Sequence, residues 1–315
     1  MITAPATPPA PTPVSAASLL ARTYRRLTAT CDVLNVHIAP ARPEGHPEVR
    51  PEAGPEGRRE GHHERRPEGH LASLPETPFD GEELTTSQEA LDAFVDAEAA
   101  RIREAHGHPP RPDVAASRAL HDYLWSVSLL MSGPWYLERR VPRIRPRQIR
   151  VDLATGGYGL HPGSGFACLP GDPAAGAPGV RVLAHEEALR AELRAAVADH
   201  MEPLLTAIGP RVRRGPRALW GMVSDDLVSG IWYLGRALGQ EERGVRAATE
   251  LLPGGSGPFP GGAGFRRLTG RDGRPHPTRT RLGCCMYYTL DAARACLTCP
   301  RTCDAERLRR LEDDD

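Results

Sequence analysis

Residues 217–239 read RALWGMVSDDLVSGIWYLGRALG, and this stretch carries the strongest secondary-structure signal of the chain. Its large apolar residues recur at spacings of three and four, the period of one face of an α-helix. The stripe consists of Trp220, Val223, Leu227, Ile231, Leu234 and Leu238. Gly239 follows directly, and glycine often ends a helix because it tolerates left-handed backbone angles. The sequence therefore predicts an amphipathic helix that buries this stripe.

The same helical period predicts shorter helices on the N-terminal side of this stretch. They span residues 18–30, 118–131 and 186–198, and a further one begins at the capping box of Thr86 and Glu89. Gly133 and Pro134 are expected to end the helix over 118–131. Pro203 is expected to begin a fresh turn after the helix over 186–198. The chain is thus predicted to be mainly helical.

Three short segments in the middle of the chain have the character of strands. They are residues 148–153, which alternate apolar and polar side chains, and the apolar runs 166–169 and 179–183. Two or three strands of one antiparallel sheet are expected here, with Cys168 as a small buried hydrophobe. The predicted fold class is α+β, mainly helical with a small central antiparallel sheet and a cysteine-bearing C-terminal segment.

Changes in composition along the chain predict its domain organisation. Residues 1–15 form a low-complexity tail, 16–38 and 79–253 the mixed α+β body, 39–78 an insertion rich in Pro, Glu, Gly and His, 254–280 a Gly/Pro-rich linker, and 281–315 the C-terminal segment. The tail and the insertion contain too few aliphatic residues to offset the entropy cost of ordering them. Both are expected to be disordered or flexible.

Charge and cysteine distribution restrict the class of protein. The 40 basic and 40 acidic residues give a formal net charge of zero, which argues against a nucleic-acid partner. Residues 123–131 form the most apolar run, far shorter than a membrane span. The N-terminal residues lack the pattern of a signal peptide. Clustered cysteines are typical of metal binding in a reducing compartment, so a cytoplasmic location is expected.

The cysteines near the C-terminus have the spacing C-C-x10-C-x2-C. They are Cys284, Cys285, Cys296 and Cys299, and Cys303 follows four residues later. Structural zinc sites usually use pairs spaced C-x2-4-C, and only the second pair has that spacing. Adjacent cysteines suit an iron–sulfur cluster, whose irons can divide neighbouring thiolates between them. The C-terminal segment is therefore predicted to bind an iron–sulfur cluster, with Cys303 as a spare thiol that leaves the cluster type open.

This cysteine pattern resembles the FhuF-like ferric-siderophore reductases. The aromatic pair Tyr287-Tyr288 and the segment 219–226 also look like that family. The resemblance implies that Cys284, Cys285, Cys296 and Cys299 hold a [2Fe–2S] cluster. It also implies the activity, an oxidoreductase that reduces siderophore-bound ferric iron to ferrous iron for release inside the cell.

The expected partners follow from the same resemblance. They are a ferric siderophore, as the substrate, and an electron donor. The donor is either a ferredoxin-like protein or a soluble reductant supplied by a flavin reductase. The sequence shows no flavin or nicotinamide fingerprint of its own. Peripheral association with the inner membrane stays open. The alternatives are a zinc-stapled, non-catalytic binding module and an iron–sulfur redox sensor.

Candidates for substrate contacts are weaker. Trp232 and Tyr233 are candidates to line an apolar pocket, whereas Trp220 lies on the helical stripe and is expected in the core. Four arginines flank the cysteine motif, and such charges are usually solvated surface. They are Arg266, Arg267, Arg279 and Arg281. A solvated surface role is the prediction for all four.

Overall fold

The computed structural model describes residues 15–39, 79–163, 165–292 and 295–313. The predicted tail and insertion lie outside the described residues except for Ser15 and Ala39. The fold is α+β and mainly helical, as predicted. No helix in the described ranges combines the length and apolar character needed to cross a membrane.

Helices make up most of the body. They are α1 Ala16–Thr30, α2 Glu83–Thr86, α3 Gln88–His106, α4 Pro112–Glu138, α5 Glu186–Val212, α6 Pro216–Ala237, α7 Glu241–Leu251 and α8 Asp304–Asp313, with 3-10 turns η1 Pro146–Gln148 and η2 Tyr287–Thr289. Helix α4 is central, since it packs against α1, α3, α5 and α6. The predicted helices are all present, although Ser87 and not Thr86 caps α3. Helices α2 and α7 were not predicted.

The prediction that Gly133 and Pro134 end α4 was wrong, because the helix continues to Glu138. Pro134 has no N–H to donate to the carbonyl of Leu130. The hydroxyl of Tyr24 in α1 donates to that carbonyl instead, at 3.2 Å. A Cβ on Gly133 would lie 2.7 Å from a methyl carbon of Leu27, so the glycine allows α1 to pack closely. Helix α5 likewise continues through Pro203, contrary to the prediction.

In the described part of the chain the strands form three small sheets, so the prediction of one antiparallel sheet was wrong in detail. The strands are β1 Val36–Ile38, β2 Phe79–Asp80, β3 Val141–Pro142, β4 Ile149–Val151, β5 Tyr158–Leu160, β6 Phe166–Cys168, β7 Val180–Val182, β8 Phe265–Thr269 and β9 Pro275–Arg279. Their orders are β1-β5-β4-β2, β3-β6-β7 and β8-β9. The first two sheets are mixed, because β1 pairs with β5 and β6 with β7 in parallel. Cys168 is fully buried, as predicted.

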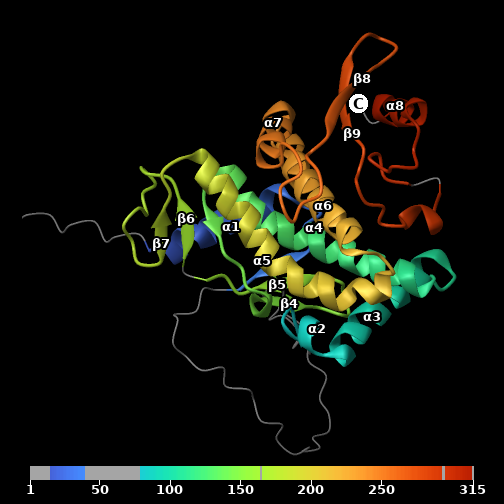
Figure 1. Cartoon of the computed structure of the whole chain (residues 1–315), viewed down its shortest axis with the longest axis horizontal. Coiled ribbons are helices and arrows are strands. Elements are labelled where there is room, and N and C mark those ends of the chain that lie inside the picture. The colour runs from blue at the N-terminus through green and yellow to red at the C-terminus, as the bar shows by residue number, and fades with distance from the viewer. Residues whose placement is uncertain (1–14, 40–78, 164, 293–294, 314–315) are drawn as a thin grey trace, which may run out of the picture.

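The C-terminal part of the chain lies against the helices. The antiparallel hairpin β8–β9 was not predicted and falls within the Gly/Pro-rich residues 254–280. Figure 1 shows β8, β9 and α8 (orange to red) beyond α6 and α7, on the opposite side of the helices from β6 and β7. The chain from β9 to α8 carries the clustered cysteines, so α6 and its neighbours form their scaffold.

His200 is a buried neutral histidine that makes the fold sensitive to acid. Its Nδ1 donates to the carbonyl of Ile144 and its Nε2 accepts from the hydroxyl of Tyr123, both at 2.8 Å. Burial lowers the pKa of His200 from 6.5 to about 4. Between these two values the unfolded chain binds a proton that the folded chain does not, so stability falls as the pH falls through this window.

We therefore expect the wild type to lose about 2 kcal/mol more stability between pH 6.5 and pH 5 than the His200→Gln variant does. Urea unfolding followed by circular dichroism at the two pH values measures this difference. His108→Gln, at an exposed position, is the matched control and should lose as much as the wild type. Equal losses for wild type and His200→Gln would contradict the assignment.

Candidate metal centre

The structure brings together the four cysteines predicted as ligands. The thiols of Cys285 and Cys296 are hydrogen-bond partners. Cys299 interacts electrostatically with both Cys284 and Cys296. Cys285 and Cys299 are buried and the other two half-buried, whereas Cys303 is exposed at the start of α8. This grouping agrees with the predicted ligand set, which stays a prediction.

Helix α6 holds the backbone that leads into the Cys284-Cys285 pair. The carboxylate of Asp225 accepts hydrogen bonds from the amides of Leu282 at 3.0 Å and Gly283 at 2.6 Å. A Cβ on Gly283 would lie 2.9 Å from Cγ of Met222, so only glycine fits this close approach to α6. The cysteine pair is thus positioned by a buried acid on the long helix.

Arg279 and Arg281 form a buried ionic cluster with α6, so the prediction that they are solvated was wrong. Arg279 donates to Asp225 and Arg281 to Asp226, each at 2.5 Å, and Arg279 is 0% exposed. Nδ1 of His121 in α4 lies 2.9 Å from the other oxygen of Asp226. The carboxylates on α6 supply opposite charges, so the two guanidinium groups can be buried away from water. Charges of this kind are buried only when they are paired.

Arg266 and Arg267 behave as predicted. They lie towards solvent in ion pairs with Asp304 and Glu242, both at 2.6 Å. Their side chains remain 37% and 54% exposed, in contrast to the two arginines at the end of the hairpin. The two pairs of arginines thus differ in burial because of their positions along the chain, since all four are the same residue type.

The pKa values of the two acids of α6 shift in opposite directions. Burial raises the pKa of Asp225, although Arg279, Arg281 and the two backbone amides oppose this. Burial also acts to raise the pKa of Asp226, but Arg281 and His121 outweigh it and lower the pKa. The carboxylate of Asp225 accepts bonds from a guanidinium and two amides, and these contacts stabilise its charged form.

A tight turn presents Cys296 and Cys299, and α8 holds this turn in place. The amide of Cys299 donates to the carbonyl of Cys296 at 2.9 Å. The guanidinium of Arg307, 1% exposed, donates to the carbonyls of Leu297 at 2.7 Å and Cys299 at 2.9 Å. On the other side, the amide of Arg281 donates to the carbonyl of Thr298 at 3.0 Å. The turn is therefore fixed from both ends of the C-terminal segment.

Positive groups surround the four thiols. The hydrogen bond from Cys296 lowers the pKa of Cys285, burial opposes this, and the charges of Arg118 and Arg281 add to the lowering. The same hydrogen bond raises the pKa of Cys296. Arg118 also forms a hydrogen bond with Cys285. The site thus favours thiolate over thiol at Cys285, which is the form that binds metals.

The thiol of Cys284 has a backbone donor. Met286 adopts the left-handed conformation, with φ of 64°, and its amide is the hydrogen-bond donor to Cys284. Burial nevertheless raises the pKa of Cys284. An amide aimed at a sulfur is one of the features that set the reduction potential of iron–sulfur centres.

The donor set fits a [2Fe–2S] cluster. Such a cluster is held by four thiolates divided between two irons, and the four thiols here share one positively charged neighbourhood. Cys284, Cys285, Cys296 and Cys299 are the residues that would hold the cluster.

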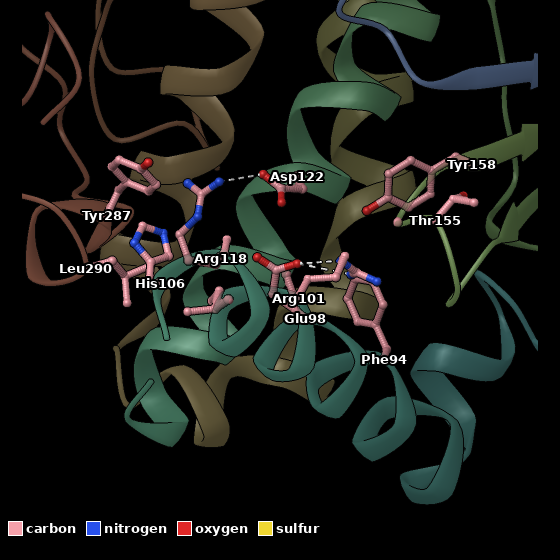
Figure 2. Close-up of a pocket in the computed structure, with 14 residues that line it drawn as sticks. Phe94, Glu98, Arg101, His106, Arg118, Asp122, Thr155, Tyr158, Tyr287 and Leu290 are labelled. Atoms are coloured by element: carbon pink, nitrogen blue, oxygen red, sulfur yellow. Dashed lines mark hydrogen bonds and ion pairs between the residues drawn. The ribbon is translucent and has the colours of Figure 1, made fainter. Parts of the chain in front are cut away.

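A charged pocket of about 380 Å³ adjoins the cysteines on the α3 side. The residues that give it this character are Glu98, Arg101, Arg118, Asp122, Tyr158 and Tyr287. Figure 2 shows Arg118 between Asp122 and the ring of Tyr287. Arg118 donates to Asp122 at 2.8 Å, and Arg101 lies 3.0 Å from Glu98. These charges are therefore largely neutralised by each other.

A second, aromatic pocket of about 440 Å³ lies beside the Cys296–Cys299 turn. Its defining residues are Trp125, Trp232, Tyr233, Arg236, Arg281 and Thr298. Trp232 and Tyr233, the sequence candidates for a pocket, do line it. Trp220 does not, since it packs against the core and makes an edge contact with Phe259 at 5.6 Å, as predicted.

Sequence reasoning missed several residues that shape this site. Asp225 and Asp226 were noted only as part of the segment 219–226, and their presence on a helix otherwise rich in apolar residues was the available signal. Arg118 and His121 lie far from the cysteines in the sequence, and no sequence pattern indicates that they contact the site. Arg307 belongs to a charged terminal helix, in which a buried arginine is not distinguishable from exposed ones.

Comparison with known families supports the cysteine assignment. The family model of the FhuF 2Fe-2S C-terminal domain matches residues 281–301. That range includes all four predicted ligands and ends before Cys303. No curated protein shows a significant match to the chain. Residues 281–301 are thus similar to the FhuF 2Fe-2S C-terminal domain, and this match supports a [2Fe–2S] cluster as the cofactor.

Proposed function

We propose that this protein is an iron–sulfur oxidoreductase that reduces siderophore-bound ferric iron to ferrous iron. The observation that carries the proposal is the grouping of four thiols in a positively charged site next to a pocket of small-molecule size. Pockets of about 300–1,000 Å³ are typical of small-ligand sites. The match of residues 281–301 to a 2Fe-2S domain of the FhuF family supports the same reaction class.

The reaction is a transfer of one electron. Fe(III) in the chelate gains the electron and becomes Fe(II), and an external one-electron donor supplies it. This donor is a ferredoxin-like protein or a reduced flavin from a flavin reductase. Oxygen ligands are hard donors, which hold Fe(III) far more tightly than Fe(II), so the reduced iron is released. Each difference of about 59 mV between donor and acceptor changes a one-electron equilibrium tenfold.

The residues around the thiols support this chemistry. When bound, the cluster supplies a centre that accepts and gives one electron at a time. Arg118, Arg281 and Arg307 place positive charge near the thiolates and so favour the more negatively charged, reduced state of the site. Burial of Cys285 and Cys299 limits the access of water to the sulfurs.

An anaerobic titration tests the proposal. The protein is reduced with dithionite, freed of excess reductant, and mixed with a ferric trihydroxamate in the presence of a ferrous-iron chelator. We expect the bleached visible absorption to return, with about one Fe(II) captured per reduced cluster, because each cluster holds one transferable electron.

The gallium(III) form of the same chelate is the control, since it accepts no electron and should leave the protein reduced. A reduced cluster that no ferric chelate reoxidises would contradict the proposal. Colourless protein that contains zinc and lacks acid-labile sulfide would instead support the zinc-stapled binding module.

A further inference from the structure

The aromatic pocket and the cysteine segment share two residues. Arg281 and Thr298 line the pocket. Thr298 lies between Cys296 and Cys299 in the sequence, and the charge of Arg281 acts on Cys285 and Cys296. A molecule in this pocket would therefore contact the turn that presents the thiols.

The aromatic rings of the pocket are held in fixed positions. Trp125 and Tyr233 meet edge to face with their ring centres 5.7 Å apart. Nε1 of Trp232 donates to Glu241 at 2.8 Å, and the hydroxyl of Tyr233 donates to Asp32 at 2.9 Å. Because their polar atoms already have partners, the rings can offer apolar faces without a conformational change. A preorganised aromatic surface binds ligands at a low entropy cost.

The charges at the pocket indicate a ligand without a large net charge. Arg236 lies at the rim, 46% exposed and 3.9 Å from Glu241. Arg281 is paired with Asp226 and, through its Nε at 3.8 Å, with Asp225. The pocket thus offers a few donors and the carboxylate of Asp122 beside aromatic rings, and no set of free cations for a highly charged anion.

The exposed rim adds apolar surface. Val33 lines the pocket and is 56% exposed. The charged pocket differs, because two ion pairs line it, Arg118 with Asp122 and Arg101 with Glu98. The chemistry of a siderophore chelate, with apolar linkers around an oxygen-coordinated ion, matches the aromatic pocket and not the charged one.

We propose that the aromatic pocket is the binding site for the organic shell of the ferric chelate, with Trp125 and Tyr233 as its main contacts and Arg236 and Arg281 as donors to its oxygens. This assignment rests on the proposed function. It places the chelate against the Cys296–Cys299 turn, where the electron would leave the protein.

Binding of a gallium(III) trihydroxamate, measured by isothermal titration calorimetry on the cluster-loaded protein, tests the assignment without electron transfer. We expect Trp125→Leu and Tyr233→Leu each to weaken binding about tenfold, as loss of an aromatic anchor does at a ligand site. Trp220→Phe, outside the pocket, and Tyr287→Leu, in the charged pocket, are the matched controls and should bind as the wild type does.

Circular dichroism and the visible spectrum establish that each variant is folded and loaded. If Trp125→Leu does not fold, Trp125→Phe and Tyr233→Leu carry the test. Wild-type binding by the folded pocket variants, weakened binding by Tyr287→Leu, or no binding by the wild type would overturn the assignment.

The two proposals fail in different ways. If ferric chelates are reduced while the pocket variants keep the kcat/KM of the wild type, the pocket is wrong and the function stands. If the gallium chelate binds in the pocket but the reduced cluster is not reoxidised by the ferric form, the reductase function is wrong and the binding site stands.

Discussion

Cys285→Ser is expected to yield protein that lacks most of its visible iron–sulfur absorption and most of its iron and acid-labile sulfide. Cys285 is 4% exposed, contacts the thiol of Cys296, and has Arg118 and Arg281 as positive neighbours. A serine hydroxyl is a hard and weakly acidic donor, so it replaces a thiolate poorly at an iron–sulfur site. Visible spectroscopy with iron and sulfide analysis measures the effect.

Cys303→Ser is the matched control, because Cys303 is exposed and lies outside the range matched by the family model. Its spectrum and iron content should equal those of the wild type. Bleaching of the Cys303 variant, or a full spectrum in the Cys285 variant, would show that the ligand set has been assigned wrongly.

Asp225→Asn is expected to destabilise the folded protein by about 3–5 kcal/mol, the usual cost of leaving one partner of a buried ion pair uncompensated. Arg279 is 0% exposed and would keep its charge without the carboxylate. The amides of Leu282 and Gly283 would also lose a charged acceptor, so the cysteine pair would be held less firmly. Chemical unfolding and the rate of cluster loss measure the two effects.

The exposed pair of Arg267 and Glu242 provides the control for this variant. Both side chains are more than half exposed, at 54% and 55%, and a surface pair of this kind contributes at most about 1 kcal/mol. Glu242→Gln should therefore keep the stability and the cluster of the wild type. A stability loss for Asp225→Asn no larger than that for Glu242→Gln would show that the buried pair does not hold the segment.

Local sequence patterns were sufficient for the parts of the fold that depend on neighbours along the chain. The stripe of α6 was found because its period is a property of one helix. The end of α4 was predicted wrongly because the hydroxyl of Tyr24, 106 positions away from Leu130, replaces the bond that Pro134 cannot make. Strand pairing failed for a similar reason, since the partners of β5 and β6 are chosen by tertiary packing.

The candidate site likewise has a part that the sequence predicts and a part that depends on tertiary packing. The cysteine spacing carries its chemistry in the sequence itself, and the structure brings those four residues together. The environment of the thiols does not follow from spacing. Asp225 and Arg279 are 54 positions apart, so neither residue alone indicates that the other will neutralise it in the core. The pockets are likewise formed by side chains from several helices and from the C-terminal segment.

The backbone on both sides of the thiols is anchored without the help of any sulfur. Asp225 holds the entry to the first pair, and Arg307 holds the turn of the second. Protein that has lost its cluster by oxidation would then keep the conformation of the binding site. Refilling the site would then need iron and sulfide, with no refolding of the surrounding chain.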